Sequence, residues 1–237
     1  MKKLFLKNEV LFAVIWIIVY VVGFANADMI SESIGMEKSI TCAVGLVLSA
    51  VLFAFVHKNN LCSHVGLCAF RGSFKKHLYF IPLIAMSCVN LINGFQMNLS
   101  VSASVFMVVS MLFVAFLEEI IFRGLLFKAM AKDNLKIAVI VSSVTFGMGH
   151  IVNLFLGEAV LGTLLQLMYA SAIGFLFTAV FLTGKSLLPC ILSHAFINAT
   201  STFARPMPVA MDITVAVVQT ILAVCYGVWL LKNAKDA

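Results

Sequence analysis

Charged residues are scarce in this 237-residue sequence: they make up 11% of it, whereas soluble domains carry about a quarter. Hydrophobic residues make up 62%, and the mean hydropathy is +1.09. So much apolar surface cannot be buried inside a single soluble core. The composition therefore excludes an ordinary soluble domain and predicts an integral membrane protein.

Two familiar signatures are also missing. The six cysteines suggest no disulfide framework, because four of them lie in apolar runs and Cys62 and Cys68 have a spacing that fits no common metal site. We therefore expect buried or reduced thiols. The sequence contains no H-E-x-x-H, so the usual helix of a zinc protease is absent.

Eight apolar segments are present, each about 18–25 residues long and therefore long enough to cross a hydrocarbon core of ~30 Å as a helix. The third is the weakest, because it contains Pro82, Asn90 and Asn93. The sequence predicts one all-α membrane domain over residues 1–237, a bundle of about eight transmembrane helices. The approximate limits of the segments are 9–27, 39–57, 78–95, 103–127, 137–156, 159–183, 186–203 and 212–231.

Basic residues follow the connections between these segments. If the N-terminus is cytoplasmic and all eight segments span, the outer side holds only Lys38 and Arg205, whereas 13 of the 16 basic residues are cytoplasmic. This asymmetry predicts a multi-pass protein of the cell membrane with both termini in the cytoplasm. It also accounts for the net charge of +6 without a nucleic-acid partner. The cytoplasmic set is Lys2, Lys3, Lys7, Lys58, Arg71, Lys75, Lys76, Lys128, Lys132, Lys136, Lys185, Lys232 and Lys235.

The N-terminus resembles a signal peptide that ends at Ala25-Asn26-Ala27. The apolar run is long and many spans follow it, so we expect an uncleaved first span.

Five ionisable residues fall inside the predicted spans: Glu118, Glu119, Arg123, His150 and His194. Each charge near mid-bilayer costs about 2.5–3.5 kcal/mol on insertion scales. Glu119 and Arg123 are four positions apart with the acid first, the favourable order for a helical ion pair. Glu118 points about 100° away from Glu119, so it cannot share Arg123 equally and is available for another role.

Polar residues on two other spans share helix faces. Phe146, His150 and Asn153 lie at i, i+4 and i+7 of FGMGHIVN, and His194 and Asn198 lie at i and i+4 of HAFIN. A lone asparagine or histidine in a span is often only an interhelical hydrogen-bond partner, and Phe146 is expected to pack.

The depths of these residues agree. Counted at 1.5 Å per residue from the nearest predicted cytoplasmic lysine, Glu118 lies about 15 Å deep, His150 about 21 Å, His194 about 14 Å and Asn198 about 20 Å. We expect these four residues to form one polar site inside the bundle.

The chemistry of such a site is hydrolysis. Glu118 beside His150 can take a proton from water, while His194 and Asn198 can donate to the oxyanion that develops on a carbonyl. In the alternative version, Glu118, His150 and His194 bind a divalent metal such as zinc, which activates the water.

Three motifs carry a family resemblance, in order, over residues 101–203: EEIIFR fits E-E-x-x-x-R, FGMGHIVN fits F-x-x-x-H-x-x-N, and HAFIN fits H-x-x-x-N/D. The sequence resembles the CPBP family, the CAAX prenyl endopeptidase and bacteriocin-processing (Abi) intramembrane proteases.

The resemblance implies an eight-helix membrane endopeptidase whose catalytic core is 101–203 and whose substrate is a membrane-associated peptide or protein. It implies catalysis by Glu118, His150, His194 and Asn198. Glu119 and Arg123 resemble the family's supporting pair, with Asn153 in a further supporting position. It leaves open a zinc or a metal-free glutamate mechanism, and also CAAX-type processing, peptide maturation or bacteriocin self-immunity as the biological role.

Two other functions use the same residues. A proton-coupled transporter would employ Glu118 and His150 as a relay, although the sequence shows no internal repeat or paired broken helices. A non-catalytic immunity or scaffold protein would use the bundle only for binding. Intact motifs argue against that reading.

Overall fold

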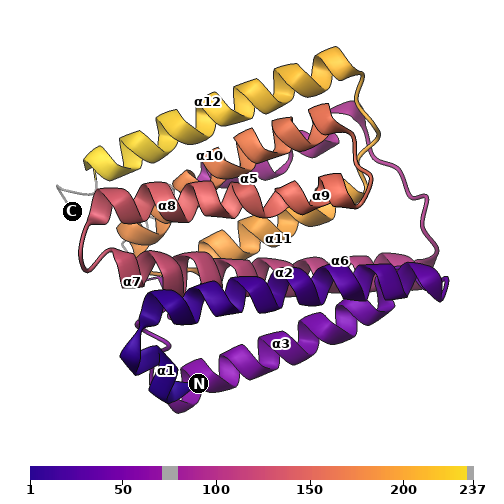
Figure 1. Cartoon of the computed structure of the whole chain (residues 1–237). Helices are drawn as coiled ribbons and strands as arrows, with labels where there is room; N and C mark the ends of the chain where they lie inside the picture. Colours follow the sequence, from indigo (N-terminus) through magenta and orange to yellow (C-terminus); the bar gives the residue numbers. More distant parts are fainter. Residues whose placement is uncertain (71–79, 234–237) are drawn as a thin grey trace.

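The computed structural model describes residues 1–70 and 80–233 (Figure 1). Every regular element in these residues is a helix, and six helices are long and apolar enough to cross a membrane. The prediction of an all-α, multi-pass membrane protein is confirmed. The six are α2 (Glu9–Ser33), α3 (Ser39–Lys58), the composite helix Val101–Met130, the composite helix Leu135–Phe155, α10 (Val160–Gly184) and α12 (Val209–Asn233).

The predicted count of about eight spans is not confirmed, because two segments form short helices. The described part of the third segment is split into α5 (Ile81–Ser87) and the 3₁₀ turn η2 (Val89–Asn93), and the seventh is α11 (Leu188–Thr202). At 1.5 Å per residue, α5 is about 10 Å long and α11 about 22 Å, both less than a ~30 Å hydrocarbon core. Proline in the first turn sets the start of both helices, and Gly94 ends η2 with a φ of 102°.

The two composite helices change their hydrogen bonding at the predicted motifs. The first runs from α6 (Val101–Glu118) through the π-helix η3 (Glu119–Phe127) to α7 (Lys128–Met130). The second runs from α8 (Leu135–Met148) through the 3₁₀ turn η4 (Gly149–Ile151) to α9 (Val152–Phe155). Interruptions of this kind inside long helices are frequent at functional sites.

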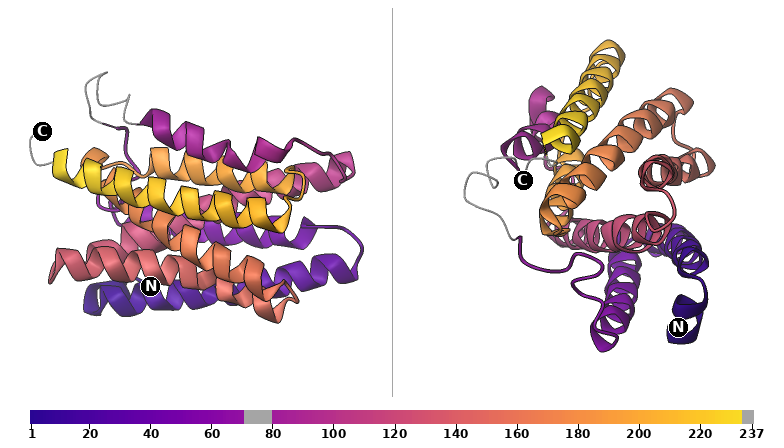
Figure 2. Two further views of the ribbon diagram at one scale, coloured as in Figure 1. Left: turned by 90° about the horizontal axis from the view of Figure 1, so that it is seen from above. Right: turned by 90° about the vertical axis from the view of Figure 1, so that its left-hand side faces the viewer.

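All nine residues of η3 are buried, so this helix forms the centre of the bundle. In the end-on view of Figure 2, the helix that contains it lies between α2 and α3 on one side and α10 on the other. The short α11 packs along α6 and also against α5, while α10 packs between α8 and α12. The bundle thus surrounds the EEIIFR segment with protein and not with lipid.

Lysines gather at one end of the bundle. Lys58 ends α3, Lys232 lies in the last turn of α12, and a cavity of about 220 Å³ at the same end is lined by Lys128, Lys132 and Lys185. Helix α1 (Lys2–Lys7) lies there too, so α1 and the end of α12 share one end of the bundle (Figure 1). Four members of the predicted cytoplasmic set lie outside the described residues: Arg71, Lys75, Lys76 and Lys235.

Candidate active site

The two neighbouring glutamates lie where α6 passes into η3. Glu118 is 9% exposed and Glu119 is fully buried. In an α-helix adjacent side chains diverge by about 100°. A π-helix closes its hydrogen bonds over five residues instead of four, so its turn holds more residues and adjacent side chains diverge less. Both carboxylates contact the same side chain, His194 of α11, at the point where the α-helix passes into the π-helix.

Glu119 is paired with Arg123, as expected from their spacing. Arg123 Nη1 donates to Glu119 Oε1 over 3.0 Å, and both side chains are 0% exposed. The guanidinium carbon lies 4.0 Å from the ring centroid of Phe146 and 5.7 Å from that of Phe177. The aromatic faces attract the cation in a place that excludes water. One carboxylate and two aromatic rings therefore surround the buried guanidinium.

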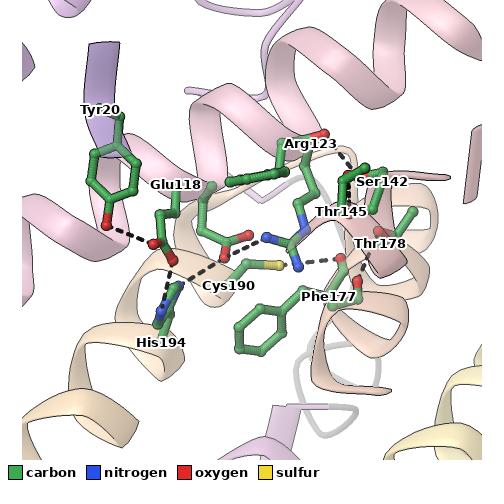
Figure 3. Close-up of polar contacts among 12 residues, drawn as sticks. Tyr20, Glu118, Arg123, Ser142, Thr145, Phe177, Thr178, Cys190 and His194 are labelled. Atoms are coloured by element: carbon green, nitrogen blue, oxygen red, sulfur yellow. Dashed lines mark hydrogen bonds and ion pairs between the residues drawn. The ribbon is translucent and has the colours of Figure 1, made fainter. Parts of the chain in front are cut away.

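His194 lies between the two glutamates (Figure 3). Its Nδ1 is 2.9 Å from Glu119 Oε1 and its Nε2 is 3.5 Å from Glu118 Oε2. The ring of Phe146 meets the imidazole edge-on with 5.5 Å between centroids, and His194 is only 5% exposed.

Tyr20 of α2 is a site residue that sequence analysis missed. Its hydroxyl donates to Glu118 Oε1 over 2.6 Å (Figure 3). Tyrosine in a span is usually expected at the membrane interface. The depth count would have found it, because Tyr20 lies 13 residues, or about 20 Å, from Lys7, close to the layer of the other site residues.

A cavity of about 270 Å³ joins most of the predicted site residues. Glu118, His150, Asn153 and Asn198 line it together with Tyr20. His150 and Asn198 are partly exposed. The structure thus brings residues from α2, α6, η4, α9 and α11 to one space.

Three predicted residues differ in how they are held. Asn153 donates through Nδ2 to Gln166 Oε1 of α10 over 2.9 Å, so its amide is occupied by a neighbouring helix. His150 lines the cavity, but in the described part of the chain no hydrogen bond joins it to Glu118. His194 contacts both glutamates and is not among the residues that line the cavity.

The predicted zinc ligands do not form a ready site. Across residues 1–70 and 80–233, no three His, Cys, Asp or Glu side chains lie close enough together to hold a metal ion. His194 Nδ1 lies 2.9 Å from Glu119 Oε1 and its Nε2 lies 3.5 Å from Glu118 Oε2, so in this arrangement His194 pairs with the two glutamates.

Residues 100–200 match a protein family described as type II CAAX prenyl endopeptidase Rce1-like. No curated protein and no solved structure matches the chain. The matched range contains the three motifs and every site residue named above except Tyr20. The match supports the resemblance of residues 100–200 to the CPBP family of intramembrane proteases.

Proposed function

We propose that this protein is an intramembrane endopeptidase that hydrolyses a peptide bond of a membrane-associated peptide or protein, with Glu118 as the general base. One observation carries this proposal: Glu118 is the glutamate that faces the cavity, whereas Glu119 is occupied by Arg123 and His194. Intramembrane carboxylates are costly and usually functional. The match of residues 100–200 to a family of prenyl endopeptidases supports the same reaction.

Glu118 is held in place on both sides. Tyr20 donates to Oε1, and His194 lies beside Oε2. In our proposal, a water in the cavity gives a proton to Glu118 while its oxygen forms a bond with the carbonyl carbon. The tetrahedral intermediate then breaks its C–N bond, and the proton on Glu118 passes to the leaving amine. Glu118 returns to its starting state without any net change.

The oxyanion requires donors near the attacked carbonyl. His150 and Asn198 line the cavity from two helices, and we assign this role to them. The motif alone suggested His194 for it, but its nitrogens face Glu119 and Glu118, so we assign His194 to positioning Glu118. In a zinc-dependent version, Glu118, His150 and His194 would hold the metal, Glu119 would support His194 through Nδ1, and the metal would activate the water.

The membrane orientation is also part of the proposal. With the lysine-rich end in the cytoplasm, both termini are cytoplasmic. CAAX-type processing, peptide maturation and bacteriocin self-immunity all supply substrates of this kind.

A peptide-level mass-spectrometric comparison of host cells tests the proposal without a known substrate. Cells carrying wild type, Glu118→Gln or the exposed control Glu158→Gln are compared at equal expression. We expect at least one peptide whose processing occurs with wild type and Glu158→Gln and is lost with Glu118→Gln. Identical peptide profiles for all three under several growth conditions would contradict it.

A further inference from the structure

A second cavity, of about 220 Å³, lies at the lysine-rich end of the bundle, the end that carries α1 and α7 in Figure 1. Three lysines line it: Lys128 of α7, Lys132 in the turn after α7, and Lys185 at the end of α10. No described residue lines both this cavity and the one at Glu118. It is therefore a separate space with its own chemistry, and we call it the lysine cavity.

The lysine cavity has an excess of positive charge. Lys132 Nζ donates to Glu9 Oε1 over 2.6 Å. Lys128 and Lys185 form no ion pair within residues 1–70 and 80–233. Asp133, the other acid in this turn, is exposed and is not among the residues that line the cavity. Three cations against one carboxylate leave two positive charges unbalanced.

Lysines at this end have a general explanation, because cations favour the C-terminal ends of helices and the cytoplasmic side of a membrane. That explanation does not require them to line one cavity. Nor does it account for Lys185, whose backbone is left-handed with a φ of 54°. Glycine is the usual residue where a helix ends in this conformation, so a lysine here carries a backbone cost that glycine would avoid.

The walls of the lysine cavity are fixed in place. The loop that carries His64 is tied to the start of α11, because the backbone N–H of Leu187 donates to the carbonyl of Gly66 over 2.8 Å. Gly66 packs so closely on Phe181 that an added Cβ would overlap its ring. Burial, and then the nearby Lys128, lower the pKa of His64, so its imidazole is neutral at pH 7 and adds no further charge.

The opposite wall is apolar. Phe127, the last residue of η3, is 1% exposed and its ring lies 6.3 Å from that of Phe181, between centroids. Leu182 and the exposed Leu135 extend this wall to the surface. A space with ammonium groups on one side and apolar side chains on the other suits an anion that carries an apolar tail.

Among biological anions, phosphate fits these features. Lysine binds it as a compact point charge, and basic pockets between transmembrane helices bind phospholipid head groups. At about 30 Å³ for each water of the liquid, the cavity has the room of about seven waters, more than a phosphate group fills.

We propose that the lysine cavity binds a phosphate group through Lys128, Lys132 and Lys185. This site is separate from the proposed hydrolysis at Glu118 and does not depend on it. The group is presented either by the head of an anionic phospholipid or by a soluble phosphate. The apolar wall favours the lipid, because an acyl chain can lie along it.

Binding to the purified full chain in a neutral maltoside detergent tests the proposal. Phosphatidylglycerol, phosphatidylcholine and oleate are titrated separately, and native mass spectrometry measures how much of each is bound. Inorganic phosphate is titrated at constant ionic strength and followed by the melting temperature and by competition with phosphatidylglycerol.

Four forms of the protein are compared: wild type, Lys128→Met/Lys185→Met, Lys128→Arg/Lys185→Arg, and the control Lys3→Met/Lys136→Met. The control removes the same charge from exposed positions that do not line the cavity. The melting temperature without ligand verifies that each variant is folded. If the first variant does not fold, the single substitution Lys185→Met at an exposed position takes its place.

We expect phosphatidylglycerol to bind wild type and the control alike. It should bind Lys128→Met/Lys185→Met about thirtyfold more weakly, the ratio expected for two lysines near a membrane surface, while the arginine variant retains binding. Phosphatidylcholine and oleate should bind wild type more weakly, because the first has no net charge and the second has no phosphate. Inorganic phosphate that raises the melting temperature of wild type and displaces the lipid identifies a soluble phosphate as a ligand, and its failure to do so identifies the lipid.

Equal binding of phosphatidylglycerol by wild type and Lys128→Met/Lys185→Met overturns the inference. An equal loss in the control overturns it too, since a general field of positive charge would then explain the binding. Oleate or phosphatidylcholine bound as tightly as phosphatidylglycerol contradicts a phosphate site. None of these measurements uses peptide cleavage, so their failure leaves the proposed protease standing, and loss of the protease leaves them valid.

Discussion

Replacement of Arg123 by methionine tests the buried ion pair at the centre of the bundle. The substitution keeps an apolar chain of similar length beside Phe146 and Phe177 but removes the charge that neutralises Glu119. Breaking a fully buried pair usually costs about 3–5 kcal/mol, because the remaining charge stays buried. His194 still lies 2.9 Å from Glu119, so we expect the lower end of this range, about 3 kcal/mol.

At about 2–4 °C per kcal/mol for a chain of this size, the loss lowers the melting temperature by roughly 6–12 °C. Thermal unfolding in detergent micelles, followed by fluorescence of the buried Trp16, measures it. Lys136→Met on exposed α8 is the matched control and should change the melting temperature little.

The double variant Arg123→Met/Glu119→Gln separates charge from packing. Removing both charges avoids the uncompensated carboxylate, so the double variant should recover at least half of the loss. A melting temperature of Arg123→Met equal to wild type would refute the reasoning. So would a double variant no more stable than the single one.

Three further predictions follow from individual contacts. Tyr20→Phe removes the donor to Glu118 and should lower the peptide-cleavage rate about tenfold in proteoliposomes with an unchanged melting temperature; an unchanged rate would count against its role. Gly147→Ala should destabilise the bundle by about 1–3 kcal/mol, since its new methyl would lie 2.8 Å from the backbone oxygen of Leu167, whereas Gly162→Ala meets nothing within 4 Å and should be neutral or stabilising in the same melting assay. Dialysis against a chelator should leave cleavage within about twofold, because the proposed step uses Glu118 itself as the base that takes the proton from water; activity lost on chelation and restored by zinc would favour the metal version.

The sequence predicts the membrane class and most of the site. The small share of charged residues predicts an integral membrane protein. Shared depth and shared helix faces identify Glu118, His150 and Asn198, which line one cavity. The pairing of Glu119 with Arg123 follows from their spacing, because the i, i+4 relation survives the change in helix type.

Other features have no clear sequence signal. A full transmembrane span and a half-length helix have the same apolar composition. The sequence therefore predicts α11 and the broken α5–η2 segment as full spans. The π-helix and the closeness of His194 to both glutamates depend on tertiary packing, and side chains that diverge by about 100° on a regular helix are not expected to share one partner. Tyr20 lacks a motif, because an aromatic residue in a span has several more common roles.

The most direct measurement of the central claim uses purified protein in H₂¹⁸O. Wild type and Glu118→Gln are incubated in phosphatidylcholine vesicles with a pool of N-terminally acylated peptides of mixed sequence. The new C-termini are then analysed for ¹⁸O by mass spectrometry. Direct attack by water predicts one ¹⁸O atom in each new carboxyl group with wild type, and at least a hundredfold fewer labelled ends with Glu118→Gln at the same melting temperature. Equal labelling by the two proteins, or cleavage by neither, would contradict the claim that Glu118 activates water.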